Sequence, residues 1–316
     1  MNTRIKVGIS TCLLGKKVRY DGNGKRNDYL VDILGPFVEW VSVCPEVECG
    51  LSIPREAMRL VGDPLSPRLM TIHTKEDITP RMQTWMKGKL NKLESESLCG
   101  YVFKSKSPSS GMRDAKIYSE KGHILTKGPG IFARAFMERF PSLPVEDEGR
   151  LNDAGLRENF IERLFVSHRW QHMANESPGV KELVAFHTRH KYLIMSHSPQ
   201  KLRELGKRVA QAKEKTLSDT LSSYYVLLME ALKLKATVRK HVNVLNHLMG
   251  YFKKVLSADE KQELLEVIAR YHQELIPLIV PVTLINHYVR KYAEPYLSEQ
   301  IYLHPHPAEL MLRNHV

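Results

Sequence analysis

Three of the four cysteines lie where they could form a reactive site. Two of them flank a carboxylate in the stretch Cys44-Pro-Glu-Val-Glu-Cys49, and Cys12 follows a short apolar run near the N-terminus. Soft thiolates select zinc, copper(I) or iron–sulfur clusters. A structural zinc site uses four ligands, typically with paired C-x-x-C spacings, and the chain has no such pair. Three converging thiols with Glu46 beside them therefore predict an enzyme, with a catalytic zinc or a cluster in which one iron lacks a protein ligand.

The alternative is that these cysteines are inert core residues, because free cysteine is among the most buried residue types. For one isolated cysteine this interpretation is favoured, and we apply it to Cys99 in the sequence Leu98-Cys-Gly100. For Cys12, Cys44 and Cys49 together, the spacing and the position after predicted strands favour a site.

Predicted strands place these residues at one edge of a sheet. Ile5–Ser10 leads into Cys12, residues 37–43 lead into Cys44, and residues 100–104 lead into the loop 105–111. In open α/β sheets, ligands bind outside the carboxyl ends of the strands, where the strand order reverses. We therefore expect these three loops to meet, although they lie far apart in the sequence.

The first half of the chain alternates short apolar strands with helices. A further strand is predicted over residues 69–73, and helices over 79–93, with Thr79 as N-cap before Pro80, and over 131–139. This alternation predicts an α/β domain over residues 1–145, Rossmann-like, with a mainly parallel sheet.

The pattern changes after Pro141. Residues 141–149 are read as a linker or exposed loop, since they combine two prolines, a glycine and three acidic residues. Beyond them, apolar residues recur at spacings of three and four over residues 202–213, 221–235, 238–255 and 259–274. Ser257 and Glu260 form a capping box before the last of these. We therefore expect an all-α domain over residues 146–316.

Composition limits the function classes. The chain has 316 residues, of which 42% are hydrophobic and 26% charged, which favours neither a disordered nor a fibrous protein. No apolar run approaches the roughly 20 residues of a membrane span, and the N-terminus lacks the apolar length of a secretory signal. We expect a cytoplasmic protein with no membrane partner, in which cysteines are thiols or metal ligands rather than disulfides.

The formal net charge of +12 is spread over both halves. Such a surface suits a polyanion, such as RNA or a phosphorylated nucleoside, although a high isoelectric point alone explains it equally well. In the helical half, basic residues around His187 and His190 alternate with aromatic residues such as Tyr192 and Tyr288. This mixture is typical of RNA contacts or, slightly favoured, of solvated helix faces over an aromatic core.

The motifs of the first half together resemble the thiouracil desulfurase family over about residues 5–140. They are Cys12-Leu-Leu-Gly15, Arg19-Tyr-Asp-Gly22, Cys44-Pro-Glu46, Gly50-Leu51, Pro54-Arg55, Lys104-Ser-Lys-Ser-Pro-Ser-Ser-Gly111 and Gly128-Pro-Gly130. The helical half, with its segments 183–193 and 243–252, is similar to a domain of unknown function that often follows it. The whole chain resembles two-domain desulfidases that act on 4-thiouridine.

This resemblance implies a 4Fe-4S cluster that is held by three cysteines and leaves one iron free to bind the sulfur of a thiolated pyrimidine. The cluster would act as a Lewis acid without changing its redox state, and water would replace the sulfur, which leaves as sulfide. Cys12 and Cys44 match two ligands, Glu46 matches the catalytic glutamate, and Ser107 matches a serine near the substrate. We expect further substrate contacts from Arg19, Asp21, Arg55 and Ser109, although Arg19 and Asp21 also suit an ordinary turn and Arg55 a surface ion pair.

One position departs from the family pattern. The third ligand of the family is the cysteine of a Ser-Pro-Ser-Cys-Gly motif, and here that position is Ser110. A neutral serine is a poor cluster ligand, and Cys49 stands where relatives have a small residue. We infer that Cys49 replaces the missing thiolate, with Cys99 as the reserve candidate.

The sequence thus predicts an iron–sulfur enzyme that desulfurates thiolated uracil, as free base, as 4-thiouridine, as its nucleotides or in tRNA. A second hypothesis is a tRNA-binding protein whose cluster is structural or redox-sensing, and a third is a zinc hydrolase. The oligomeric state is not indicated.

Overall fold

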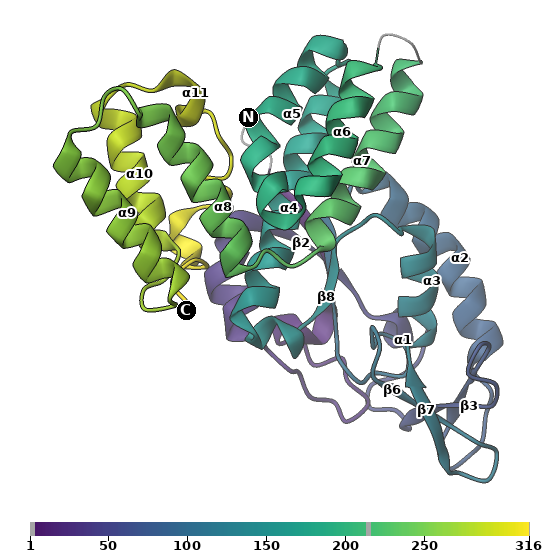
Figure 1. Ribbon diagram of the computed structural model, residues 1–316. Helices are drawn as coiled ribbons and strands as arrows, with labels where there is room; N and C mark the ends of the chain where they lie inside the picture. The colour runs from purple at the N-terminus through teal and green to yellow at the C-terminus, as the bar shows by residue number, and fades with distance from the viewer. Residues whose placement is uncertain (1–3, 213–215, 316) are drawn as a thin grey trace. The chain divides into compact units, whose positions relative to one another are not determined.

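The computed structural model describes residues 4–212 and 216–315, and the chain forms two compact units, Met1–Asp153 and Ala154–Val316. Figure 1 shows the first unit in purple to teal and the second in teal to yellow. The first is an α/β unit and the second is all helical, as the sequence predicts. Each unit is described by itself.

The first unit contains a parallel sheet that carries the motif loops. Its strands lie in the order β2 (Val38–Val43), β1 (Ile5–Ser10), β5 (Gly100–Phe103) and β8 (Val145–Asp147), and every neighbouring pair is parallel. In the sheet, β2, the strand that follows β1 in the sequence, lies on one side of β1, and β5 lies on the other side. The order therefore reverses at β1, and the loops after β1, β2 and β5 leave the sheet beside this reversal, where α/β folds place ligands.

A second sheet follows a different pattern. Two antiparallel hairpins, β3–β4 (Met58–Val61 and Arg68–Thr71) and β6–β7 (Ala115–Tyr118 and Ile124–Gly128), join through a parallel pairing of β3 with β6. The strand predicted over 69–73 is β4, so it belongs to this mixed sheet and not to the parallel one. Its partner β3 is partly polar, which is why the sequence pattern alone did not reveal the hairpin.

Helices cover the first unit and close its core. They are α1 (Pro45–Glu48), α2 (Thr79–Ser95) and α3 (Ile131–Arg139). The core packs Tyr101 and Phe103 of β5 against Phe132 and Phe136 of α3. The predicted N-cap role of Thr79 is wrong: Thr79 is the first helical residue, and its hydroxyl accepts the backbone N–H of Leu69 instead.

The prediction of a linker or exposed loop over residues 141–149 is wrong for its central part. Residues 145–147 form β8, and the backbone of this strand pairs with β5. Glu146 and Asp147 are buried, because Arg150 pairs with the Glu146 carboxylate and the N–H groups of Gly149 and Arg150 donate to Asp147. A buried carboxylate needs such partners, and they allow acidic residues to occupy a strand inside the domain.

The second unit is built from helices. They are α4 (Ala154–Asn175), α5 (Val180–His197), α6 (Pro199–Ala210), α7 (Leu217–Lys233), α8 (Val238–Met249), α9 (Ala258–His272), α10 (Ile279–Lys291) and the single turn α11 (Pro295–Ser298). The predicted helices over 202–213, 221–235, 238–255 and 259–274 correspond to α6 to α9, although Lys213 lies outside the described residues. The capping box of Ser257 and Glu260 is confirmed at the start of α9.

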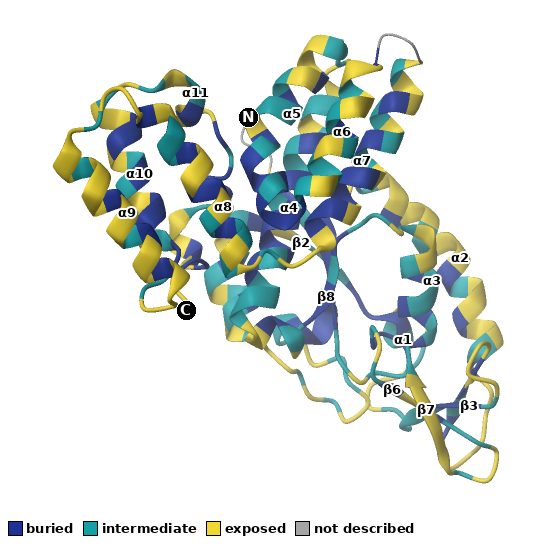
Figure 2. Cartoon of the chain, viewed as in Figure 1, coloured by how far each residue is buried: buried dark blue, intermediate teal, exposed yellow. Residues whose placement is uncertain are grey.

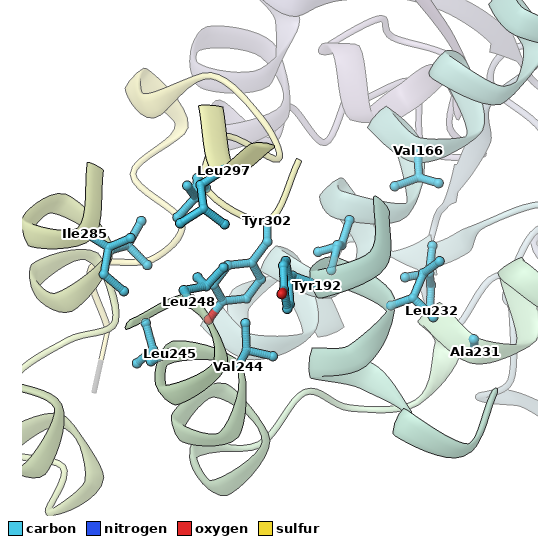
Figure 3. Packing of buried hydrophobic residues seen from close by; sticks show 14 of the residues in the cluster. Val166, Tyr192, Ala231, Leu232, Val244, Leu245, Leu248, Ile285, Leu297 and Tyr302 are labelled. Carbon is cyan, nitrogen blue, oxygen red and sulfur yellow. The ribbon is translucent and has the colours of Figure 1, made fainter. Parts of the chain in front are cut away.

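Aromatic residues fill the core of the helical unit. Figure 3 shows Tyr192 and Tyr302 packed among Val244, Leu245 and Leu248. His190 and Tyr288 are also buried, so these residues of the basic and aromatic pattern belong to the core rather than to an exposed surface. None of the helices that the structure describes combines the length and apolar character of a bilayer-spanning segment.

Candidate active site

A pocket of about 430 Å³ opens at the carboxyl edge of the parallel sheet. It is lined by the loops that follow β1, β2 and β5. Among the predicted site residues it brings together Cys12, Arg19, Cys44, Glu46, Arg55, Ser107 and Ser110. The topology thus places residues that are almost 100 positions apart around one cavity.

Cys12 and Cys44 occupy the first turns after β1 and β2. Cys12 lies in a 3-10 turn over Thr11–Leu14, and Cys44 is the N-cap of α1. The Glu48 carboxylate accepts the Cys44 N–H at 2.9 Å and pairs with Lys89 of α2, which fixes this strand end. Burial raises the pKa of the Cys12 thiol to about 11 and that of Cys44 to about 12, where the Glu46 carboxylate adds to the effect. Both are therefore thiols unless a metal ion binds them.

Glu46 projects from the first turn of α1 into the same pocket. One of its oxygens, Oε1, accepts a hydrogen bond from the Ser109 hydroxyl at 2.5 Å. The other, Oε2, accepts the Cys44 thiol at 3.5 Å and lies 3.9 Å from the Arg55 guanidinium. The carboxylate is thus held between a thiol, a hydroxyl and a cation, beside the space a substrate would enter.

The serine loop is held by the N-terminus of α3. The N–H groups of Gly130 and Phe132 donate to the carbonyls of Gly111 and Ser109 at 2.7 and 2.9 Å. A Cβ on Gly130 would lie 2.5 Å from the Ser109 backbone, so only glycine permits this approach. These N–H groups therefore have partners within the protein and are not free to bind an anion.

Sequence reasoning missed the anchor of this loop, Glu148. Its carboxylate accepts the Ser105 N–H at 2.7 Å and the Ser105 hydroxyl at 2.8 Å, and it forms an ion pair with Lys104. Glu148 follows β8, so it reaches the site from the fourth strand of the parallel sheet. The sequence did not indicate this role, because Glu148 follows two other acidic residues in a segment whose composition is typical of an exposed loop.

The predicted substrate-binding residues separate into two groups. Arg19 and Arg55 line the pocket, and Arg55 is nearly buried, with its Nε atom lacking a hydrogen-bond partner. Its Nη1 donates to the Val18 carbonyl at 3.0 Å. Asp21 does not line the pocket: it accepts the Asn23 N–H in the turn and lies 3.5 Å from Arg19. Asp21 therefore occupies an ordinary turn, which was the alternative to a substrate contact.

Ser107 and Ser109 face one another within the loop. Ser107 lines the pocket, and its hydroxyl lies 3.0 Å from that of Ser109 and accepts the Ser110 N–H. Ser109 is fully buried and reaches the pocket only through its bond to Glu46. Its position favours a role in orienting Glu46.

The third thiol does not reach the pocket. Cys49 ends α1, its thiol donates to the Glu46 carbonyl at 3.2 Å, and its side chain packs in the hydrophobic core. Cys99 is buried just before β5, outside the lining, and none of the four cysteines forms a disulfide. A centre held by three thiolates is therefore matched at two positions, Cys12 and Cys44, while the third lining position carries the Ser110 hydroxyl.

The helical unit contains a buried ionic cluster that sequence reasoning also missed. Arg313 donates to Glu162 at 2.9 Å and to Glu158 at 3.3 Å, and His197 lies 3.2 Å from Glu162. The carboxylates of Glu158 and Glu162 lie close to His306, in an arrangement that could hold a metal ion. The Arg313 guanidinium already supplies positive charge there, so we interpret the cluster as a structural anchor of the C-terminal segment.

Comparisons with known proteins match both units. The family model for 2-thiouracil desulfurase matches residues 7–148, and the model for a protein of unknown function, DUF1722, matches residues 191–307. The YbgA protein of Escherichia coli strain K12, described as uncharacterized, is 31% identical over 153 residues, which are 48% of this chain and 90% of that protein. A solved structure of a [4Fe-4S]-dependent thiouracil desulfidase, TudS, is 27% identical and covers 48% of this chain and 95% of that one, with a TM-score of 0.39.

The matched segment 7–148 contains every pocket residue described above, and the DUF1722 match lies within the helical unit. The chain therefore belongs to the 2-thiouracil desulfurase family through its N-terminal domain, followed by a YbgA-like DUF1722 domain.

Proposed function

We propose that this protein removes sulfur from thiolated uracil and replaces it with oxygen from water. The observation that carries the proposal is the pocket in which Cys12, Cys44, Glu46 and Ser107 meet. Two soft ligands beside a carboxylate combine a metal site with an acid–base group, which is what hydrolysis of a carbon–sulfur bond requires.

Cys12 and Cys44 would hold a 4Fe-4S cluster at this pocket. When bound, such a cluster supplies a Lewis acid that polarises the carbon–sulfur bond of the substrate. The third ligand is Cys49 in this proposal, because a thiolate is a far better iron ligand than the neutral Ser110 hydroxyl. Cys49 would have to give up its hydrogen bond to the Glu46 carbonyl and turn from the core towards Cys44.

Glu46 would orient the attacking water and take its proton. The water oxygen forms a bond to the ring carbon, the carbon–sulfur bond breaks, and sulfur leaves as hydrogen sulfide after protonation. The ring carbon keeps its oxidation state, so no external oxidant or reductant is needed. Ser109 would keep Oε1 in position through its 2.5 Å hydrogen bond, and Ser107, which lines the pocket, would contact the substrate.

Arg55 and Arg19 are the cations of the pocket that we expect to contact the oxygen atoms of the substrate. The unpartnered Nε of Arg55 supports this role, because a buried donor without a partner costs free energy. We include 2-thiouracil, 4-thiouridine, its nucleotides and thiolated tRNA among the substrates to be tested.

The test is a desulfuration assay on protein that has been reconstituted with iron and sulfide without oxygen. We expect release of sulfide together with loss of the long-wavelength absorbance of the thiolated base. If the loaded protein leaves every thiolated pyrimidine unchanged but still binds RNA, the chain is instead a nucleic-acid-binding protein with a structural or redox-sensing cluster. If the reconstituted protein holds zinc and no iron, the zinc hydrolase is favoured.

A further inference from the structure

An aromatic side chain that the proposed chemistry does not use lines the candidate active site. Tyr20 is 46% exposed and lies in the loop after β1, whose residues 16–28 are exposed or half-buried (Figure 2). Among the residues that the structure describes, it is the only aromatic residue that lines this pocket. Single exposed aromatic residues are normal on a protein surface, so a role for Tyr20 depends on what holds its ring beside the pocket.

The turn that carries Tyr20 is closed by its own hydrogen bonds. The Arg19 carbonyl accepts the Gly22 N–H at 2.9 Å, and the Asn23 carbonyl accepts the Arg19 N–H at 3.2 Å. Gly22 has a φ of 75°, in the left-handed region that glycine adopts at no steric cost. The Tyr20 side chain therefore projects from a hydrogen-bonded turn of defined backbone conformation.

Arg55 joins this turn to the proposed catalytic carboxylate. Its backbone N–H donates to the Tyr20 carbonyl at 2.9 Å, and its Nη1 donates to the Val18 carbonyl at 3.0 Å. Its Nη2 lies 3.9 Å from Glu46 Oε2. A ligand that rests on the Tyr20 ring would therefore be held at a fixed place relative to Glu46.

Arg19 restrains the orientation of the ring. Its guanidinium carbon lies 5.7 Å from the centre of the Tyr20 ring, within the range of a cation–π contact. Asp21 in turn lies 3.5 Å from the Arg19 guanidinium and holds it there. An aromatic side chain that is already restrained loses less conformational entropy when a ligand stacks on it.

A thiolated uracil ring presents two kinds of surface to this pocket. Its edge carries oxygen, sulfur and N–H groups, which suit Arg55, Glu46 and a metal centre. Its face is an apolar π-surface, which stacks on aromatic side chains. The apolar residues Val43, Ala57 and Met58 also line the pocket, but none of them offers a flat surface. Tyr20 is therefore the lining residue that matches the face of the ring.

We propose that the Tyr20 ring stacks on the face of the thiolated pyrimidine and selects planar, unsaturated rings over saturated ones. This inference deepens the proposed function and rests on it for the position of the thiolated ring. Saturation of the C5–C6 bond keeps the thiocarbonyl, N–H and oxygen groups, but it makes two ring carbons tetrahedral and interrupts the π-face. The pocket should therefore discriminate between two ligands that carry the same polar groups.

Binding of uracil and 5,6-dihydrouracil tests this role directly, because neither ligand carries sulfur that the enzyme could remove. On the reconstituted full chain, isothermal titration calorimetry should show that uracil binds about tenfold more tightly than 5,6-dihydrouracil. This factor lies within the range that one stacked aromatic side chain contributes. Tyr20→Ala and Tyr20→Leu should bind both ligands with the affinity of 5,6-dihydrouracil, whereas Tyr20→Phe, which keeps the ring, should retain the preference.

Leu65→Ala is the matched control, because it removes an apolar side chain that is 82% exposed and lies outside the pocket. It should keep the tenfold preference for uracil. All four variants should retain about four iron atoms per chain, since neither Tyr20 nor Leu65 is a proposed cluster ligand. A changed preference then does not reflect loss of the cluster.

The assignment of Tyr20 is wrong if the unaltered protein binds uracil no more tightly than 5,6-dihydrouracil, or if Tyr20→Ala keeps the preference. Its failure is distinct from failure of the proposed function. Sulfide release from 2-thiouracil with the same KM in Tyr20→Ala and in the unaltered protein contradicts the stacking and leaves the desulfuration standing. A preference for uracil that depends on Tyr20, without sulfide release from any thiolated pyrimidine, contradicts the desulfuration and leaves the stacking standing.

Discussion

The Ser109 hydroxyl donates a hydrogen bond to Glu46 Oε1 over 2.5 Å and joins the loop after β5 to the first turn of α1. Ser109 is fully buried, and its carbonyl in turn accepts N–H groups from the start of α3. The position of the proposed catalytic carboxylate therefore depends on a helix that lies outside the pocket.

Ser109→Ala should lower kcat about tenfold and leave KM nearly unchanged. The reason is that a hydrogen bond to a carboxylate is worth about 1.5–3 kcal/mol, and its loss lets Glu46 move without removing a substrate contact. Steady-state kinetics on the reconstituted protein measure both constants. Ser52→Ala, which removes an exposed hydroxyl bonded to the Pro54 carbonyl, is the matched control. An unchanged kcat for Ser109→Ala would show that Glu46 does not need this bond.

Glu46→Gln should reduce sulfide release by about 10²–10⁴-fold while the iron content stays the same, because the amide cannot take a proton from water. Glu39→Gln is the control, because it removes the same negative charge at an exposed position of β2, the strand that precedes α1. If Glu46→Gln retains activity near that of the control, another group accepts the proton.

The sequence predicted β1 and β5 well because Ile5, Val7 and Ile9 of β1 and the residues of β5 form short apolar, buried runs, as parallel strands in α/β folds do. It missed β8, since Glu146 and Asp147 are buried through hydrogen bonds from Gly149 and Arg150 in the turn that follows, which an apolar pattern does not reveal. The mixed sheet was missed for a related reason: its hairpins depend on cross-strand pairing rather than on a continuous apolar pattern.

The site shows the same limit. Strand ends located Cys12, Cys44 and the serine loop, because the carboxyl ends of parallel strands share one edge. Spacing alone suggested that Cys49 accompanies Cys44, but α1 intervenes. Cys49 follows this helix as its C-cap, where its thiol donates to the Glu46 carbonyl and its side chain packs in the core.

Arg313→Met should destabilise the helical unit by about 3–5 kcal/mol, because it leaves the Glu158 and Glu162 carboxylates buried without their cation. Urea unfolding followed by far-ultraviolet circular dichroism measures the change. Arg26→Met is the control, since Arg26 forms exposed pairs worth about 1 kcal/mol or less. Equal effects of the two substitutions would contradict a structural role for the buried cluster.

The helical unit should lose stability as the pH falls from about 6.5 to 4. Burial lowers the pKa of His190 and His241 to about 3 and that of His187 and His306 to about 4. In the unfolded chain these groups take up protons near pH 6.5, so the unfolded state binds more protons below that pH and stability falls. Each histidine contributes at most about 1.4 kcal/mol per pH unit.

Glu158 acts in the opposite direction, since burial raises its pKa to about 8 and its folded form gains protons as the pH falls to about 4.5. One carboxyl against four histidines leaves acid destabilising overall. Urea midpoints at pH 7 and pH 5 test this, and His190→Asn should flatten the dependence while His123→Asn, in an exposed turn, should not. A midpoint that is equal or higher at pH 5 would refute the assignment of neutral buried histidines.

Iron per chain after anaerobic reconstitution tests the central claim most directly. We expect about four iron atoms in the unaltered protein and in Cys99→Ser, and a large loss in Cys12→Ser, Cys44→Ser and Cys49→Ser. If Cys49→Ser keeps the full iron content and Ser110→Ala loses iron, then Ser110, and not Cys49, is the third ligand of the cluster. Full iron in Cys12→Ser or Cys44→Ser would contradict the account, because no cluster could then be held by this pocket as proposed.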